Sequence, residues 1–129
     1  DLFKKITIDA QITFLKLASY QGTSSTGSVK QLIGLNQDIA GQHVIVLEDI
    51  VDTGITLDHI MRQLNGYQPA SIKVVTLLFK PEACQKDINP DYKGFEIPND
   101  FIVGYGLDYK GFARNYKDIY VLKKSTEIA

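Results

Sequence analysis

The segment from Val44 to Leu57, VIVLEDIVDTGITL, constrains the fold of this chain more than any other. Four apolar residues that predict a strand come first, and the acidic pair Glu48 and Asp49 is expected where that strand ends. A Gly/Thr turn then leads into a helix. In open α/β sheets, ligands bind beyond the carboxyl ends of the strands. The N–H groups of such a turn, with the positive end of the helix, bind anions. The segment therefore predicts a phosphate site flanked by carboxylates that suit a divalent cation.

The residues after this turn predict a strand-helix-strand unit. A helix is expected from about Leu57 to Asn65, with its apolar positions on one face and Gly66 as a C-terminal cap. The apolar run from Ile72 to Phe79 is typical of a strand that is covered on both faces. By the right-handed crossover rule, the two strands belong to one parallel sheet.

The rest of the chain predicts shorter elements within a single domain, residues 1–129. Further strands are expected at residues 12–18, 29–35, 101–105 and 120–123, with an irregular stretch at 81–98. The polar run from Ser19 to Ser28 predicts a surface loop. Asp1 to Ile6 has the pattern of the end of a helix, so we expect that an N-terminal segment is missing.

Composition excludes several functional classes. The formal net charge of −1 argues against a broad face that binds nucleic acid. The single cysteine, Cys84, cannot form an internal disulfide and is expected to be an idle thiol. The sequence holds neither a signal peptide nor an apolar stretch long enough to cross a membrane, so a cytoplasmic location without membrane partners is expected.

Two motifs resemble those of a known family. The string Glu-Asp-x-x-Asp-Thr-Gly-x-Thr at residues 48–56 resembles the phosphoribosyl-pyrophosphate signature of type I phosphoribosyltransferases, above all the hypoxanthine-guanine branch. The blocks at 94–98 and 101–109 resemble the purine-binding strand and turn of that branch. The resemblance implies an α/β fold with a mainly parallel twisted sheet flanked by helices and a flexible loop hairpin. Members of this family usually carry a further N-terminal segment.

The resemblance assigns the signature residues to the activated sugar. Asp52 would be the catalytic residue, taking the purine N7 proton or stabilising positive charge on the base. Glu48 and Asp49 would hold the ribose hydroxyls, partly through Mg²⁺. The 5′-phosphate would be anchored by four consecutive residues, Thr53, Gly54, Ile55 and Thr56. Ile55 stands where some relatives have lysine, so one charge near the phosphate is expected to be absent.

The other predicted site residues lie outside the signature. Lys80 would donate to the purine 6-oxo group, Phe101 would stack on the base, and Ile102 would offer backbone groups to its edge. On the pyrophosphate side, Asp108 would hold Mg²⁺ and Arg114 would pair with the leaving group. Ser19 and Tyr20 would belong to a loop that closes over the site and excludes water. Each of these residues also has an ordinary structural interpretation as a surface, turn or core residue.

The implied reaction is transfer of the phosphoribosyl group from 5-phosphoribosyl 1-pyrophosphate (PRPP) to hypoxanthine or guanine, which yields IMP or GMP and pyrophosphate in purine salvage. The expected partners are these small molecules, and a homodimer or homotetramer is expected by analogy with relatives. Two alternatives stay open: a PRPP-sensing regulator that binds nucleic acid, and a transferase that prefers xanthine. Lys80 and residues 101–108 argue against adenine and pyrimidines but not against xanthine.

Overall fold

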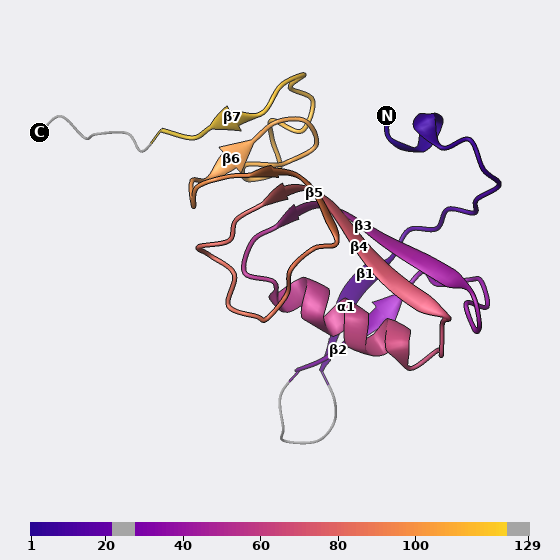
Figure 1. Ribbon diagram of the computed structural model, residues 1–129. Coiled ribbons are helices and arrows are strands. Elements are labelled where there is room, and N and C mark those ends of the chain that lie inside the picture. Colours follow the sequence, from indigo (N-terminus) through magenta and orange to yellow (C-terminus); the bar gives the residue numbers. More distant parts are fainter. Residues whose placement is uncertain (22–27, 124–129) are drawn as a thin grey trace, which may run out of the picture. The chain divides into compact units, whose positions relative to one another are not determined.

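The structure is a computed structural model that describes residues 1–21 and 28–123, without the side chains of residues 19–30. The chain divides into two compact units, one made of residues 1–44 and 56–72 and the other of residues 45–55 and 73–129. Figure 1 labels helix α1 and the strands of both. No helix within the described ranges is long and apolar enough to cross a membrane. That the whole chain is a single domain stays a prediction.

The first unit contains a short 3₁₀ helix, η1 (Phe3–Lys5), and an antiparallel hairpin of β1 (Lys16–Gln21) and β2 (Ser28–Ile33). The predicted strands at 12–18 and 29–35 are therefore displaced toward the polar loop. Gly34 explains the displacement, because it adopts φ +96° and a side chain there would collide with the Phe14 carbonyl oxygen. The hairpin ladder consequently ends with Lys16 opposite Ile33.

Helix α1 (Ile55–Asn65) confirms the predicted helix and begins two residues earlier than expected. Its buried residues, Leu57, Ile60 and Leu64, follow the predicted three- and four-residue spacing. Within the first unit, the Gln63 side-chain oxygen accepts a hydrogen bond of 2.7 Å from the Leu32 N–H and so ties this helix to the hairpin. After the helix it is Gln68, with φ 56°, that takes the left-handed conformation, rather than the predicted cap Gly66.

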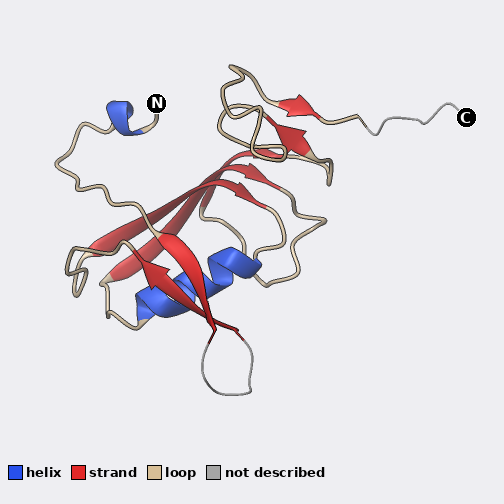
Figure 2. Cartoon of the chain, turned by 180° about the vertical axis from the view of Figure 1, so that it is seen from behind, coloured by secondary structure: helices blue, strands red, loops and turns tan. Residues whose placement is uncertain are grey.

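The second unit is built on a sheet in which β3 (His43–Val51), β4 (Ser71–Phe79) and β5 (Tyr92–Glu96) lie in the order β3-β4-β5. Strands β4 and β5 pair in parallel, and all three arrows point the same way in Figure 2, which confirms the predicted parallel sheet. The core of this unit includes five apolar sheet residues, Val46, Val51, Val74, Leu78 and Phe79.

Strand β3 is longer than predicted. It runs through Val51, so Glu48 and Asp49 lie inside the strand and not at its end. The reason is that Ile50 and Val51 are β-branched and continue the extended backbone, while the Lys80 N–H donates to the Val51 carbonyl oxygen at 3.0 Å. The carboxyl end of β3 therefore falls at Asp52.

Strand β5 lies within the stretch predicted to be irregular. All five of its residues are exposed, and charged residues and a glycine interrupt its apolar pattern, so the sequence carries little strand signal. Gly94 is needed here because a Cβ at its position would lie 2.7 Å from the Leu77 carbonyl oxygen of β4. A glycine thus permits the close approach of the two backbones.

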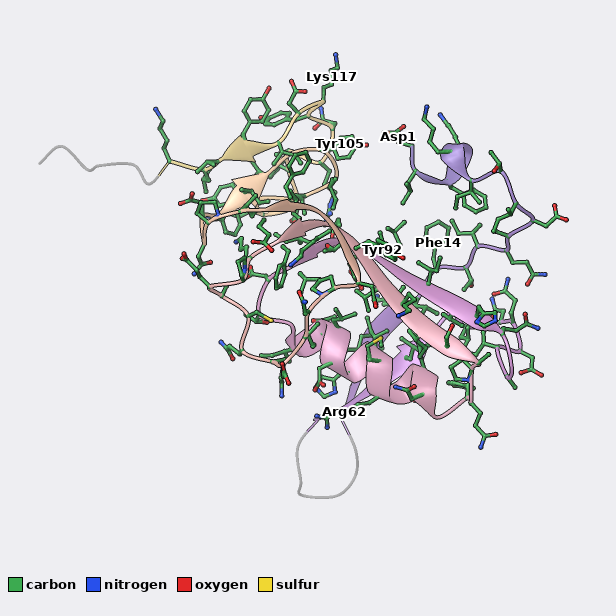
Figure 3. The ribbon with its side chains drawn as sticks, viewed as in Figure 1. Asp1, Phe14, Arg62, Tyr92, Tyr105 and Lys117 are labelled. Carbon is green, nitrogen blue, oxygen red and sulfur yellow. The ribbon has the colours of Figure 1, made fainter. Side chains whose placement is uncertain are left out.

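The chain ends in a small antiparallel pair, β6 (Ile102–Val103) and β7 (Tyr120–Val121). Both strands are shorter than the predicted ranges 101–105 and 120–123. Gly104 ends β6, because it adopts φ +93° and a side chain there would collide with the Asp118 carbonyl oxygen. The loop between the two strands contains Tyr105 and Lys117, which Figure 3 labels.

Candidate functional site

The turn between β3 and α1 lies at the position that the sequence predicted for an anion site. Asp52, Thr53 and Gly54 follow the last strand residue directly, and α1 begins at Ile55. Gly54 is buried and adopts φ +79°, a left-handed conformation that glycine takes at little cost. The Thr53 hydroxyl accepts a hydrogen bond of 3.4 Å from the Ile55 N–H. Thr56 follows in the first turn of α1 and is exposed.

Asp52 and Lys80 form an ion pair at the carboxyl ends of two neighbouring strands. The Lys80 Nζ lies 3.3 Å from the Asp52 Oδ2. The lysine side chain is 5% exposed and the aspartate side chain 47%. The structure therefore holds a buried cation against a carboxylate that faces solvent, at the position where the sequence predicted base recognition and catalysis.

Glu48 and Asp49 are neighbours on β3, and consecutive strand residues project to opposite faces. Glu48 is half-buried, whereas Asp49 is exposed and its Oδ1 accepts a hydrogen bond of 2.7 Å from the Ile50 N–H. Burial, and second to it the negative charge of Asp49, raise the pKa of the Glu48 carboxyl. A bound cation or hydroxyl donor would relieve both effects.

The described residues contain no cluster of three or more His, Cys, Asp or Glu side chains that could hold a metal ion unaided. Mg²⁺ is usually bound by one or two carboxylates together with substrate phosphates and waters, and not by a cage made only of protein. One or two of the predicted ligands Glu48, Asp49 and Asp108 could supply carboxylate oxygens of this kind, and their assignment to Mg²⁺ stays a prediction.

Asp108 and Arg114, the two residues predicted on the pyrophosphate side, lie together. The Arg114 Nη2 is 3.3 Å from the Asp108 Oδ1, and its Nη1 donates to the Gly106 carbonyl oxygen at 2.7 Å. The other carboxylate oxygen of Asp108 accepts a hydrogen bond of 2.8 Å from the Gly111 N–H. The structure thus pairs Asp108, which was predicted to hold Mg²⁺, with Arg114, which was predicted to bind pyrophosphate.

Phe101 and Ile102 differ in exposure. The Phe101 side chain is 54% exposed, and its ring meets that of Tyr109 edge to face with 6.0 Å between centroids. Ile102 is buried in β6, so only its backbone could contact a ligand. An exposed ring can offer its face to a purine.

The predicted closing loop is described only in part. The backbones of Ser19 and Tyr20 lie in β1, opposite Lys30 and Val29. The side chains of both residues, and all of residues 22–27, lie outside the described residues. Loop closure therefore stays a prediction.

Cys84 was predicted to be an idle thiol, yet the structure places its sulfur beside the turn between β3 and α1. A Cβ built on Gly54 would lie 3.1 Å from the Cys84 Sγ. No local sequence pattern could have indicated this contact, since 30 positions separate the two residues along the printed sequence.

Comparisons with known proteins agree on one family. A family model described as the phosphoribosyl transferase domain matches residues 1–110. The hypoxanthine-guanine phosphoribosyltransferase of Mycobacterium tuberculosis is 44% identical over 120 residues, which are 92% of this chain and 58% of the relative. The enzyme of that name from Streptococcus pneumoniae is 44% identical over 125 residues, 96% of this chain and 69% of the relative. The chain thus spans little more than half the length of the mycobacterial relatives it matches.

Solved structures give the same result. A hypoxanthine phosphoribosyltransferase from Staphylococcus aureus is 37% identical, with a TM-score of 0.80 over 95% of this chain and 67% of that one. A variant of the Trypanosoma cruzi hypoxanthine phosphoribosyltransferase, in complex with its product IMP, is 41% identical, with a TM-score of 0.68 over 73% of this chain and 50% of that one.

Proposed function

Because the chain belongs to the phosphoribosyl transferase domain family and, within it, to the hypoxanthine-guanine phosphoribosyltransferases, we propose that the protein transfers the 5-phosphoribosyl group of PRPP to hypoxanthine and guanine. The products are IMP or GMP and pyrophosphate. One observation carries the proposal: the Asp52–Lys80 ion pair directly adjoins the turn of residues 53–55. Asp52, proposed to act on the base, therefore immediately precedes the residues proposed to bind the 5′-phosphate.

In the proposed reaction a purine nitrogen bonds to the anomeric carbon as the bond from that carbon to pyrophosphate breaks. Positive charge develops on the ribose ring in the transition state, as in other glycosyl transfers. Asp52 accepts the N7 proton of the purine or stabilises the charge that builds on the base. Its half-exposed carboxylate supports this role, because a ligand can reach it from solvent.

The sugar and its phosphates are bound by the other signature residues. Backbone N–H groups of residues 53–56 and the threonine hydroxyls hold the 5′-phosphate, helped by the N-terminus of α1. Because Glu48 and Asp49 project to opposite faces of β3, we assign the ribose hydroxyls to one of them directly and to the other through bound Mg²⁺. Their charge favours the cationic ring. Glu48, Asp49 and Asp108 would hold Mg²⁺, which when bound neutralises the departing pyrophosphate. Arg114 binds pyrophosphate through guanidinium donors that now contact Asp108 and Gly106.

Selectivity for the base comes from Lys80. An ammonium has only donors, so it binds a 6-oxo group and meets the 6-amino group of adenine donor to donor. The burial of Lys80 and its contact with Asp52 support this role, because they hold the cation in one place. Phe101 stacks on the purine, and the backbone of Ile102 contacts its edge. A preference for xanthine is the nearest alternative, since xanthine carries the same 6-oxo group.

The proposal is tested by incubating the full protein with Mg²⁺, PRPP and each of hypoxanthine, guanine, xanthine, adenine and uracil. IMP or GMP should form with an equal amount of pyrophosphate, and adenine and uracil should give no nucleotide. Product with xanthine alone would favour the xanthine alternative. If no base reacts and RNA or DNA shifts in a gel, the regulatory alternative replaces the enzyme.

Asp52→Asn tests the assignment of the base in the same assay. Turnover should fall by about 10²- to 10⁴-fold, the usual contribution of general acid–base catalysis. The affinity for IMP should stay within a few-fold, because asparagine has nearly the same shape. Unchanged turnover would refute the role of Asp52.

A further inference from the structure

Three residues of the segment that follows β4 pack against Gly54. A Cβ built on this glycine would lie 3.1 Å from the Cys84 Sγ, 3.4 Å from the Lys86 Cβ and 3.5 Å from the Ile88 Cδ1. These are van der Waals contacts or closer, and Gly54 itself is buried. The segment of residues 84–88, here named the brace segment, therefore occupies the space on one side of the turn.

The brace segment also bonds to the backbone of the turn. The Gln85 N–H donates to the Thr53 carbonyl oxygen at 2.9 Å. A peptide unit is planar, so fixing the carbonyl of Thr53 also orients the N–H group of Gly54, which belongs to the same unit. That N–H is one of the donors proposed for the 5′-phosphate.

Cys84 holds the brace segment in its compact form. Its thiol donates to the Lys86 carbonyl oxygen at 3.3 Å and approaches that of Ile88 at 3.9 Å. The Ile88 N–H donates to the Lys86 carbonyl oxygen at 2.8 Å and tightens the same loop. Cys84 therefore both contacts Gly54 and shapes the brace segment that packs against Gly54.

We propose that the brace segment positions the phosphate-binding turn, with Cys84 and Ile88 as its positioning residues, and that it thereby sets the affinity for pentose 5-phosphates. The identity of the ligand, a pentose 5-phosphate, rests on the proposed function. Neither residue touches substrate. Both act through Gly54, whose left-handed backbone, φ +79°, is held by this packing together with the bond from the Gln85 N–H to the Thr53 carbonyl oxygen. Binding donors must be held within a fraction of an ångström to be effective.

The test compares two disruptive variants of the full protein with two matched controls. Cys84→Leu adds bulk against Gly54, and Ile88→Ala removes a contact. Cys84→Ser keeps a small hydrogen-bond donor. Asp87→Asn changes an exposed residue of the same segment that is not among the three nearest to a Cβ on Gly54. Ribose 5-phosphate is the probe, with its Kd measured by calorimetry. Exchange of the Gly54 and Ile55 amide protons, measured by NMR without ligand, reports on the turn itself.

Both disruptive variants should speed exchange of the two amide protons and raise the Kd by about 10- to 100-fold, the cost of a small misplacement of binding groups. The KM for PRPP should rise while kcat at saturation is largely kept. Both controls should stay within twofold. If one disruptive variant fails to fold, the other decides.

Exchange rates equal to those of the controls would overturn the proposal, whether or not the protein binds phosphate. Faster exchange with an unchanged Kd would also overturn it, because position would then not govern affinity. If the unsubstituted protein binds no ribose 5-phosphate, the proposed function fails, and the exchange rates alone decide whether residues 84–88 position the turn.

Discussion

Removing Asp52 should destabilise the protein far more than removing Lys80, because the two partners of this ion pair are unequally exposed. The lysine side chain is 5% exposed and the aspartate side chain 47%, with 3.3 Å between the charged atoms. Asp52→Ala leaves a buried ammonium without its carboxylate. Lys80→Met keeps the apolar stem in place and leaves a carboxylate that water can solvate.

The magnitudes follow from these exposures. Leaving a buried charge uncompensated costs roughly 3 kcal/mol or more in free energy of unfolding. We take the low end of this range because the Asp52 side of the pair is open to water. The loss of a partner by a half-exposed carboxylate costs about 1 kcal/mol or less. Adding Lys80→Met to Asp52→Ala removes the uncompensated charge, so the double variant should be about 2 kcal/mol more stable than Asp52→Ala alone.

The assay is urea unfolding at pH 7 of the parent protein, both single variants and the double variant. Similar slopes of free energy against urea would show that the same unfolding transition is compared. If the two single variants lose equal free energy of unfolding, or if the double variant is no more stable than Asp52→Ala, the argument from unequal burial is wrong.

Three further predictions concern other parts of the structure. Burial, followed by the charge of Asp49, raises the pKa of Glu48, so the stability due to its bound proton is present below about pH 4.5 and is lost as the pH rises through the raised value. Glu48→Gln should therefore be more stable than the parent at pH 7 and lose this advantage at pH 4 in urea unfolding; an equal difference at both pH values would contradict this. Phe101→Leu should weaken IMP binding in calorimetry by about 1 kcal/mol, because it removes the aromatic face but keeps apolar area, and an unchanged Kd would exclude stacking. Gly94→Ala should cost about 1–3 kcal/mol in urea unfolding, because its Cβ would lie 2.7 Å from the Leu77 carbonyl oxygen, and a loss under 0.5 kcal/mol would refute the need for close approach.

The sequence predicted the elements that carry strong local patterns. The apolar run from Ile72 to Phe79 and the periodic helix after Gly54 both correspond to observed elements, and their order predicted a parallel sheet. The end of β3 was predicted four residues too early, because the acidic pair Glu48 and Asp49 was expected to end the strand. Strand pairing outweighed that preference, since the ladder continues to the bond between Lys80 and Val51.

The parts that sequence could not predict depend on long-range contacts. Strand β5 has no apolar alternation of its own and exists because it pairs with β4. The contact between Cys84 and Gly54 joins two loops, and neither has a pattern that anticipates the other. The pairing of Asp108 with Arg114 likewise depends on the path of the chain between them, which the left-handed Lys110 and Gly111 redirect.

The selectivity ratio of Lys80→Met tests the central claim most directly. The measurement is kcat/KM for hypoxanthine divided by kcat/KM for adenine, in the full parent protein and in the variant, with PRPP and Mg²⁺ saturating. Loss of a donor to a buried oxo group is worth about 1–3 kcal/mol, so the ratio should fall at least fivefold, with hypoxanthine losing most of the rate. A ratio that is unchanged, in a variant that folds and still binds ribose 5-phosphate, would contradict base selection by Lys80.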